Sequence, residues 1–233
     1  NFGVVTKLRI PLYLVPEKIV SFVLKFKTDS DFEKGILPLR KLRQSGVINS
    51  LLHIANSTRF LISNSTFPED VSPEEILSDK DCLDILNKSP LKVGMWTAVG
   101  GFYGTTSEIK LKIKSLKKAM KNHCQITTFT DSKLSVLKKL SQLPMVKKTN
   151  LGRNVNDSIV AFSSIHGLIK GIPTNRATEN ILWREKNIDD LGLIWSCPII
   201  NSNEKDIKKF KILAESIFEK YGFELPITLT LIN

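Results

Sequence analysis

Few residues in this 233-residue chain have the types and spacing that chemistry requires. The three histidines, His53, His123 and His166, lie far apart, so no two of them have the short spacing of a metal site. Their surroundings are more typical of a strand, a cap and a helix face than of a general base or ligand. The histidines alone therefore predict neither a metal centre nor an acid–base catalyst.

The cysteines give an equally weak signal. Cys82, Cys124 and Cys197 have no paired spacing, whereas a zinc site would need CxxC or Cys/His pairs. Three unpaired thiols are typical of a reduced chain. We therefore expect a cytoplasmic protein with no metal.

A glycine-rich stretch, VGGFYG at Val99–Gly104, is the remaining motif that chemistry could use. Its glycines end a predicted strand and enter a predicted helix, and the start of such a helix can cradle a phosphate. The alternative, which the pattern favours, is a tight turn from strand to helix. Because no P-loop, GxGxxG or GxSxG motif occurs either, the residues alone do not predict a self-contained active site.

The element that would position any site is clearest between Gly192 and Ile232. The apolar run Leu193–Ile200 predicts a buried strand, and Asn203 is a good N-cap for the helix that follows. Gly222 fits the end of that helix, and the alternating run after Pro226 predicts a second strand. The apolar face of the helix comprises Ile207, Phe210, Leu213, Ala214, Ile217, Phe218 and Tyr221.

Two further segments follow the same strand–helix–strand plan. The predicted elements are Leu91–Phe102, Ser107–Lys121 and Gln125–Thr130 in one segment, and Lys18–Phe26, Asp31–Gln44 and Val47–Ile54 in the other. Additional helices are expected over Leu134–Leu143 and after Asn156. The fold class predicted is therefore α+β, with ferredoxin-like split βαβ repeats and an antiparallel sheet with helices on one face.

The net charge of +11 raises the question of an anionic partner. On the helix predicted at Ser107–Lys121 the lysines occupy the positions between inward-facing apolar residues, which is typical of a solvated face. Lysine far outnumbers arginine and no aromatic residues interleave with the basic run, which argues against nucleic acid. An anionic partner domain or a phosphate-bearing cofactor stays compatible with the charge. No apolar run is long enough to cross a membrane, so no membrane partner is expected.

Five segments, taken in order, carry a resemblance to a known family. They are NFGVVTK (Asn1–Lys7), the stretch Met95–Met120, GIPTNRATENILWR (Gly171–Arg184), GLIWSCPII (Gly192–Ile200) and FEKYGFELPITLTLI (Phe218–Ile232). Together they resemble FAD-linked oxidases of the vanillyl-alcohol oxidase and p-cresol methylhydroxylase type. The matched segments belong to the end of that family's FAD-binding domain and to its cap, or substrate, domain.

The resemblance implies that the chain contains parts of two domains. Residues 1–15 would be the end of an FAD-binding domain or a connecting strand, and residues 16–233 an incomplete cap domain of a larger protein. The parent would oxidise para-substituted phenols or related alcohols by hydride transfer to FAD. Its partners would be the missing FAD-binding domain, an aromatic small-molecule substrate and, in a homodimer, a second copy.

Site residues follow from the resemblance position by position. Backbone atoms of Gly3, Val4 and Val5 match the family's flavin-contacting turn, and Glu179 matches an active-site glutamate. Trp195 would line the substrate pocket. The alternative for Trp195 is a place in the hydrophobic core, and the alternative for Glu179 is an exposed position on a helix.

The chain departs from the family pattern at two places. Trp183 and Leu193 stand where some members tether FAD covalently, and neither side chain can form that bond, so we expect non-covalent FAD. The family's catalytic Tyr-Arg pair is absent from the sequence. The isolated chain is therefore expected to be inactive, and the alternative is a non-catalytic α+β binding module with the same fold.

Overall fold

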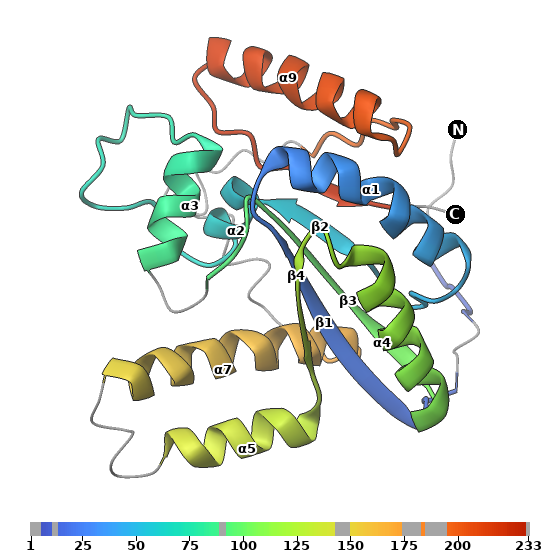
Figure 1. Cartoon of the computed structure of the whole chain (residues 1–233). Helices are drawn as coiled ribbons and strands as arrows, with labels where there is room; N and C mark the ends of the chain where they lie inside the picture. Colours follow the sequence, from blue (N-terminus) through green and yellow to red (C-terminus); the bar gives the residue numbers. More distant parts are fainter. Residues whose placement is uncertain are drawn as a thin grey trace.

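A five-stranded antiparallel sheet forms the centre of the computed structural model, which describes residues 6–10, 14–88, 92–142, 150–173, 183–184 and 195–231. The strand order is β4-β1-β3-β2-β5, and every neighbouring pair is antiparallel (Figure 1). The strands are β1 (Lys18–Phe26), β2 (His53–Asn56), β3 (Trp96–Gly104), β4 (Gln125–Phe129) and β5 (Thr228–Thr230).

The first four strands form two interleaved βαβ units. Helix α1 (Asp29–Gln44) connects β1 to the segment that leads to β2, and α4 (Thr106–Met120) connects β3 to β4. With the order β4-β1-β3-β2, this is the split βαβ arrangement of a ferredoxin-like fold, as the sequence predicts. Strand β5 extends the sheet by pairing with β2.

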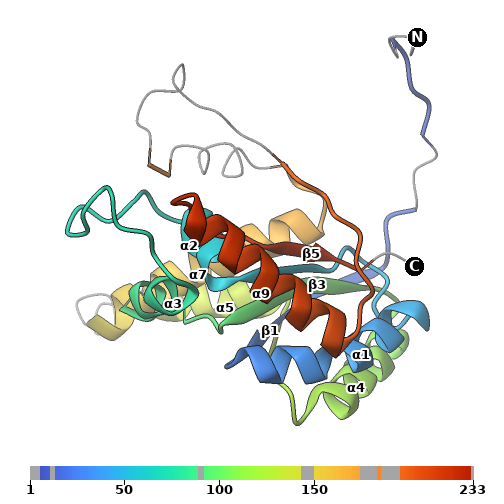
Figure 2. The same cartoon turned by 90° about the horizontal axis from the view of Figure 1, so that it is seen from above.

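Other helices lie around this core. They are α2 (Ser57–Ile62), α3 (Asp79–Lys88), α5 (Asp131–Ser141), α7 (Asn150–Ile169) and α9 (Glu204–Lys220). Helices α1, α4 and α9 gather on one face of the sheet, as predicted, and α5 and α7 add a second layer on the opposite side (Figures 1 and 2).

The side-chain pattern of β1 explains the two layers. Phe22, Leu24 and Phe26 alternate along the strand and belong to the main core beneath α1 and α4. Val23 points to the other face, where it joins Phe129 and Leu134 in a smaller cluster with α5 and α7. Both faces of β1 are therefore buried, which accounts for its nearly continuous apolar sequence.

Side-chain caps precede α1, α4 and α9, the last at the predicted residue. Thr28 before α1 and Thr105 before α4 each form a reciprocal capping box with the acidic residue three positions on. Asn203 caps α9, and Gly222 follows that helix with a φ of 76°, the left-handed conformation that favours glycine. Local sequence therefore determines where these helices begin and end.

Three predicted strands and one predicted helix start differ from the structure. The strand expected from Leu91 begins at Trp96, and α7 begins at Asn150, so Asn156 lies inside that helix and does not cap it. The segment expected as a strand over Val47–Ile54 becomes one only at His53, because β2 needs β3 and β5 beside it to form its ladders. The buried strand predicted over Leu193–Ile200 is wrong in its described part, residues 195–200, which form no ladder. Ile199 is 87% exposed there, so an apolar run alone did not decide burial. Among the described helices none has the length and apolarity that crossing a membrane requires.

Candidate functional site

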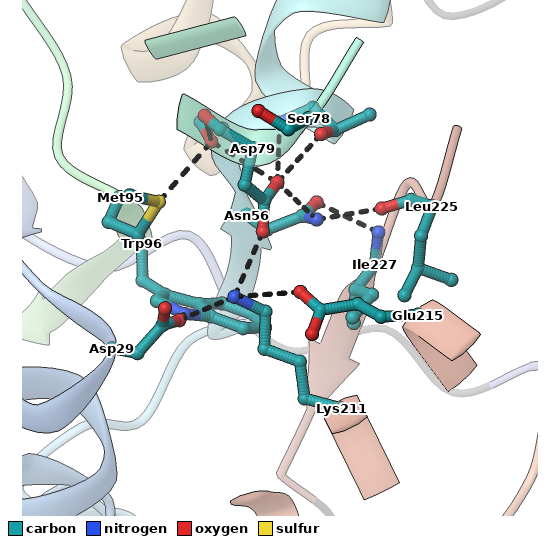
Figure 3. A network of polar contacts seen from close by, with 12 residues as sticks. Asp29, Asn56, Ser78, Asp79, Met95, Trp96, Lys211, Glu215, Leu225 and Ile227 are labelled. Carbon is teal, nitrogen blue, oxygen red and sulfur yellow. Dashed lines mark hydrogen bonds and ion pairs between the residues drawn. The ribbon is translucent and has the colours of Figure 1, made fainter. Parts of the chain in front are cut away.

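Lys211 is the centre of a polar network between three helices (Figure 3). Its Nζ lies 2.7 Å from Asp29 Oδ1 on α1, 3.1 Å from Asp79 Oδ2 on α3 and 3.2 Å from Glu215 Oε1 one turn along α9. The Trp96 indole Nε1–H also donates to Asp29 Oδ1, at 2.7 Å. A single buried ammonium therefore joins α1, α3 and α9.

Asp79 is the most heavily bonded carboxylate of this network. Its Oδ1 accepts from Asn56 Nδ2 at 2.8 Å, from the Thr58 hydroxyl at 2.6 Å and from the Ser57 hydroxyl at 3.2 Å. Asn56 continues the network: its Nδ2 donates to Leu225 O, and its Oδ1 accepts from Ile227 N at 2.8 Å. The network thus reaches from α9 through α3 and β2 to the segment before β5.

The electrostatics of this network assign Lys211 a structural role. Burial lowers its pKa, but hydrogen bonding to Asp29 and attraction to the Asp79 and Asp29 carboxylates outweigh burial and leave the pKa above its ordinary value. A permanently charged ammonium that is bound by three carboxylates can neither accept a proton nor act as a nucleophile. The network is therefore an anchor for α9 rather than a catalytic centre.

A second cluster combines a serine, a histidine and an aspartate. Ser21 Oγ lies 2.6 Å from His166 Nδ1, and His166 Nε2 lies 3.5 Å from Asp131 Oδ1. These are the residue types of a hydrolytic triad, but Ser21 is fully buried in β1 and could not reach a substrate. Lys170 binds the outer side of Asp131 at 3.0 Å, and its hydrogen bond is the main cause that keeps the pKa of that carboxyl below its usual value. The cluster fastens α7 and the start of α5 to the sheet.

The two remaining histidines and the cysteines form no catalytic arrangement among the described residues. His123 lies in the turn after α4, where its backbone N–H donates to Met120 O at 3.0 Å. Burial, together with the nearby Arg59, lowers the pKa of His53 in β2. Burial raises the pKa of the Cys82 and Cys124 thiols to about 12, so both stay protonated at neutral pH. Cys197 is exposed. No group of three or more acidic, histidine or cysteine side chains that could hold a metal occurs among the described residues.

The glycine-rich stretch forms the end of β3, as predicted, and that strand continues to Gly104. A Cβ on Gly100 would come within 2.6 Å of the Phe22 ring, and one on Gly101 within 2.5 Å of Ile169 Cγ2. Both glycines therefore allow close packing between layers. The start of α4 is already occupied by a negative charge, because Glu108 accepts from the Thr105 backbone N–H at 2.6 Å. This arrangement favours the structural interpretation of the motif over a phosphate site.

Of the site residues predicted from the sequence, the described structure contains two. Trp195 lies in the extended segment before α9 and is 67% exposed. Trp183 is buried beside α2 and α3, with its ring edge-on to Phe67 at 5.3 Å. Gly3, Val4, Val5, Glu179 and Leu193 lie outside the described residues.

Arg184, next to Trp183, is a contact point that the sequence interpretation did not identify. Its guanidinium lies 4.0 Å from the centre of the Phe67 ring, forms an ion pair with Glu224 and donates to the backbone oxygens of Pro73 and Glu75. Arg184 and Trp183 thus hold their segment against the α2–α3 region.

The sequence signal for Lys211 was its place four residues after Ile207, on the apolar side of a helix.

Comparison with known proteins gives a structural match but no sequence match. No family model and no curated protein matches the sequence. The fold is similar to part of p-cresol methylhydroxylase in its substrate-bound crystal structure, with a TM-score of 0.69 and 17% identity. It is also similar to part of 4-ethylphenol oxidase from Gulosibacter chungangensis in complex with isoeugenol, with a TM-score of 0.72 and 16% identity.

The two matches show which portion of a larger architecture this chain resembles. Each covers 93% of this chain but only 37% of p-cresol methylhydroxylase and 38% of 4-ethylphenol oxidase. The chain therefore spans less than two fifths of the length of the enzymes that it matches. Its fold resembles the cap domain of flavin-dependent oxidases of this type, in agreement with the resemblance found in the sequence.

Proposed function

We propose that this chain is the cap portion of a flavin-dependent oxidoreductase that acts on para-substituted phenols or related alcohols. The observation that carries the proposal is the structural match, which includes nearly all of this chain and little more than a third of two enzymes named for phenolic compounds. The sequence resemblance, in which five segments occur in family order, supports the same assignment independently of the structure.

In this proposal FAD is bound without a covalent link, mostly by a domain outside this chain. The flavin supplies the hydride acceptor, and the cap contributes orientation and the walls of the substrate pocket. Trp195 is the described residue suited to that task, since its ring is exposed and can pack against an aromatic substrate. Glu179 is the titratable residue proposed for the active site, and Gly3, Val4 and Val5 for backbone contacts with the flavin.

The test is to express the longest reading frame that contains these residues and to compare it with residues 1–233 alone. We expect the longer protein to show flavin absorption that is bleached anaerobically by 4-ethylphenol, and the isolated chain to be colourless after addition and removal of FAD. A longer protein that takes up no flavin would contradict the assignment. It would favour the alternative, a binding module that has the fold without the chemistry.

Substitutions in the longer protein test the site residues. Trp195→Ala should raise the KM for the phenol, and Glu179→Gln should lower turnover. Glu69→Gln, an exposed glutamate far along the chain from both, is the matched control and should change neither constant. Equal effects of Glu179→Gln and Glu69→Gln would remove Glu179 from the proposed site.

A further inference from the structure

Helix α9 exposes much of the apolar stripe that its sequence encodes. Leu213, Ile217, Phe218 and Tyr221 recur at helical spacing, and we refer to these four as the α9 flank. All four are exposed in the structure, Leu213 by 57% and Tyr221 by 66%. A surface helix normally turns such a stripe toward the core, so the α9 flank is an apolar surface without a covering in the described structure.

The orientation of α9 is held by specific contacts. Ile207, Lys211 and Ala214 are the residues that α9 buries, and they lie on one side of the helix at steps of four and three. Lys211 cannot leave that side without separating from Asp29 and Asp79. The polar network thus fixes the side of α9 that faces the sheet, and Leu213, Ile217 and Tyr221 lie off that side. Phe218, seven residues after Lys211, lies on the buried side near the end of the helix and is 36% exposed.

The size of the α9 flank indicates what kind of partner can cover it. The exposed parts of its four side chains amount to on the order of 400 Å². A symmetric pair of such flanks would bury about 800 Å², which is below the ~1,200 Å² of a stable complex between separate molecules. An area of about 800 Å² is, however, within the range of contacts between domains of one chain, because the covalent link supplies a high effective concentration.

We propose that the α9 flank is the docking surface for another domain of the same polypeptide, namely the flavin-binding part. This inference rests on the proposed function, and it adds the surface and the chemistry of the contact. Lys209 and Lys220 are exposed beside the flank, and Lys220 Nζ lies 5.4 Å from the centre of the Tyr221 ring. The facing domain should therefore present an apolar centre with acidic side chains around it.

Hydroxyl-radical footprinting measures the contact directly. Residues 1–233 alone and the longer protein are oxidised in parallel, and modification of Phe218 and Tyr221 is quantified by mass spectrometry. We expect modification on the order of tenfold lower in the longer protein, since the centre of an interface is packed as densely as a protein interior. Leu111, which is 66% exposed on α4, is the internal control and should react equally in both.

Two variants separate docking from folding. Leu213→Gln with Ile217→Gln removes apolar contact from the α9 flank, and Leu111→Gln removes a similarly exposed side chain elsewhere. In the longer protein the double variant should bind FAD roughly tenfold more weakly, whereas Leu111→Gln should bind it normally. In residues 1–233 alone, both variants should unfold at the same urea concentration as the unchanged chain.

The outcomes distinguish this inference from the proposed function. A longer protein that binds flavin while Phe218 and Tyr221 stay as reactive as in the isolated chain overturns the docking surface and leaves the function standing. A longer protein that binds no flavin overturns the proposed function and, with it, the flavin-binding domain as the partner of the α9 flank. Concentration-dependent dimerisation of residues 1–233 that the double variant abolishes would assign the flank to a second copy and overturn the inference.

Discussion

Helices α4 and α9 have similar sequences in one respect: each begins at a side-chain cap and carries an apolar stripe among lysines. Helix α4 turns Ile109, Leu116 and Met120 into the core and leaves most of its lysines in solvent. Helix α9 does the reverse in part, since it buries Lys211 and exposes Leu213 and Ile217. The comparison shows that periodicity predicts a helix, whereas its rotation depends on partners that lie elsewhere in the chain.

The largest effect is expected from removing the carboxylate on which the orientation of α9 depends. Asp79→Ala removes one of the three carboxylates around Lys211 and takes from Asn56 Nδ2 and the Thr58 hydroxyl the oxygen to which both donate. Breaking a buried pair costs about 3–5 kcal/mol. Urea unfolding of residues 1–233 measures the loss. Asp84→Ala, at an exposed position on the same helix, is the control, and equal losses for both variants would show that Asp79 anchors nothing.

A leucine-to-alanine pair tests the contrast between the two stripes. Leu116 of α4 is fully buried, so Leu116→Ala should lower the free energy of unfolding by about 2–5 kcal/mol. Leu213→Ala on α9 should change it by no more than about 0.5 kcal/mol in the isolated chain. Similar losses in thermal or urea unfolding would mean that α9 packs its stripe inward after all.

The caps of the two helices should respond alike to acid. Backbone and side-chain hydrogen bonds from Thr105 lower the pKa of Glu108 from 4.5, and side-chain hydrogen bonds from Asn203 and Asn201 lower that of Asp206 from 3.8. Because the folded-state pKa values are depressed, the stabilisation is present above those ordinary values and is lost as the pH falls through the folded-state values. Glu108→Gln should therefore lose stability at neutral pH and show a shallower decline in acid, as measured by urea unfolding along a pH series.

The smallest effect is expected on the solvated face of α4. Lys114 lies one turn from Lys110, Lys117 and Lys118, and like charges at these spacings repel one another. Lys114→Glu should therefore stabilise the chain by up to about 0.5 kcal/mol at low salt, and the gain should shrink when salt is added. Circular dichroism during thermal unfolding at two salt concentrations checks both points. A marked loss of stability would indicate a partner for Lys114 within the chain.

Local signals explain why much of the fold was predictable. Helix α4 and strands β1 and β4 were placed within about two residues, since the apolar period of the local sequence changes where each of them begins and ends. The strands at Val47–Ile54 and Leu193–Ile200 were less predictable, because strand formation depends on a neighbour that the local sequence does not specify.

The polar anchor of α9 was not predictable for the same reason. Lys211 and Asp29 are 182 residues apart, and nothing in either local sequence indicates that they meet. Trp183 was predicted near the flavin, and the structure shows the core position that it takes beside Phe67. Glu179, Gly3, Val4, Val5 and Leu193 stay predictions, since their assignment came from the family resemblance.

The difference between the three thiols has a practical consequence. The thiols of Cys82 and Cys124 have raised pKa values and stay protonated at neutral pH. Cys197, two residues after Trp195, is exposed to solvent. A maleimide dye should therefore label the natural chain at Cys197 in preference to the other two. Fluorescence from that position would report the arrival of a phenol or of a neighbouring domain without any engineered cysteine.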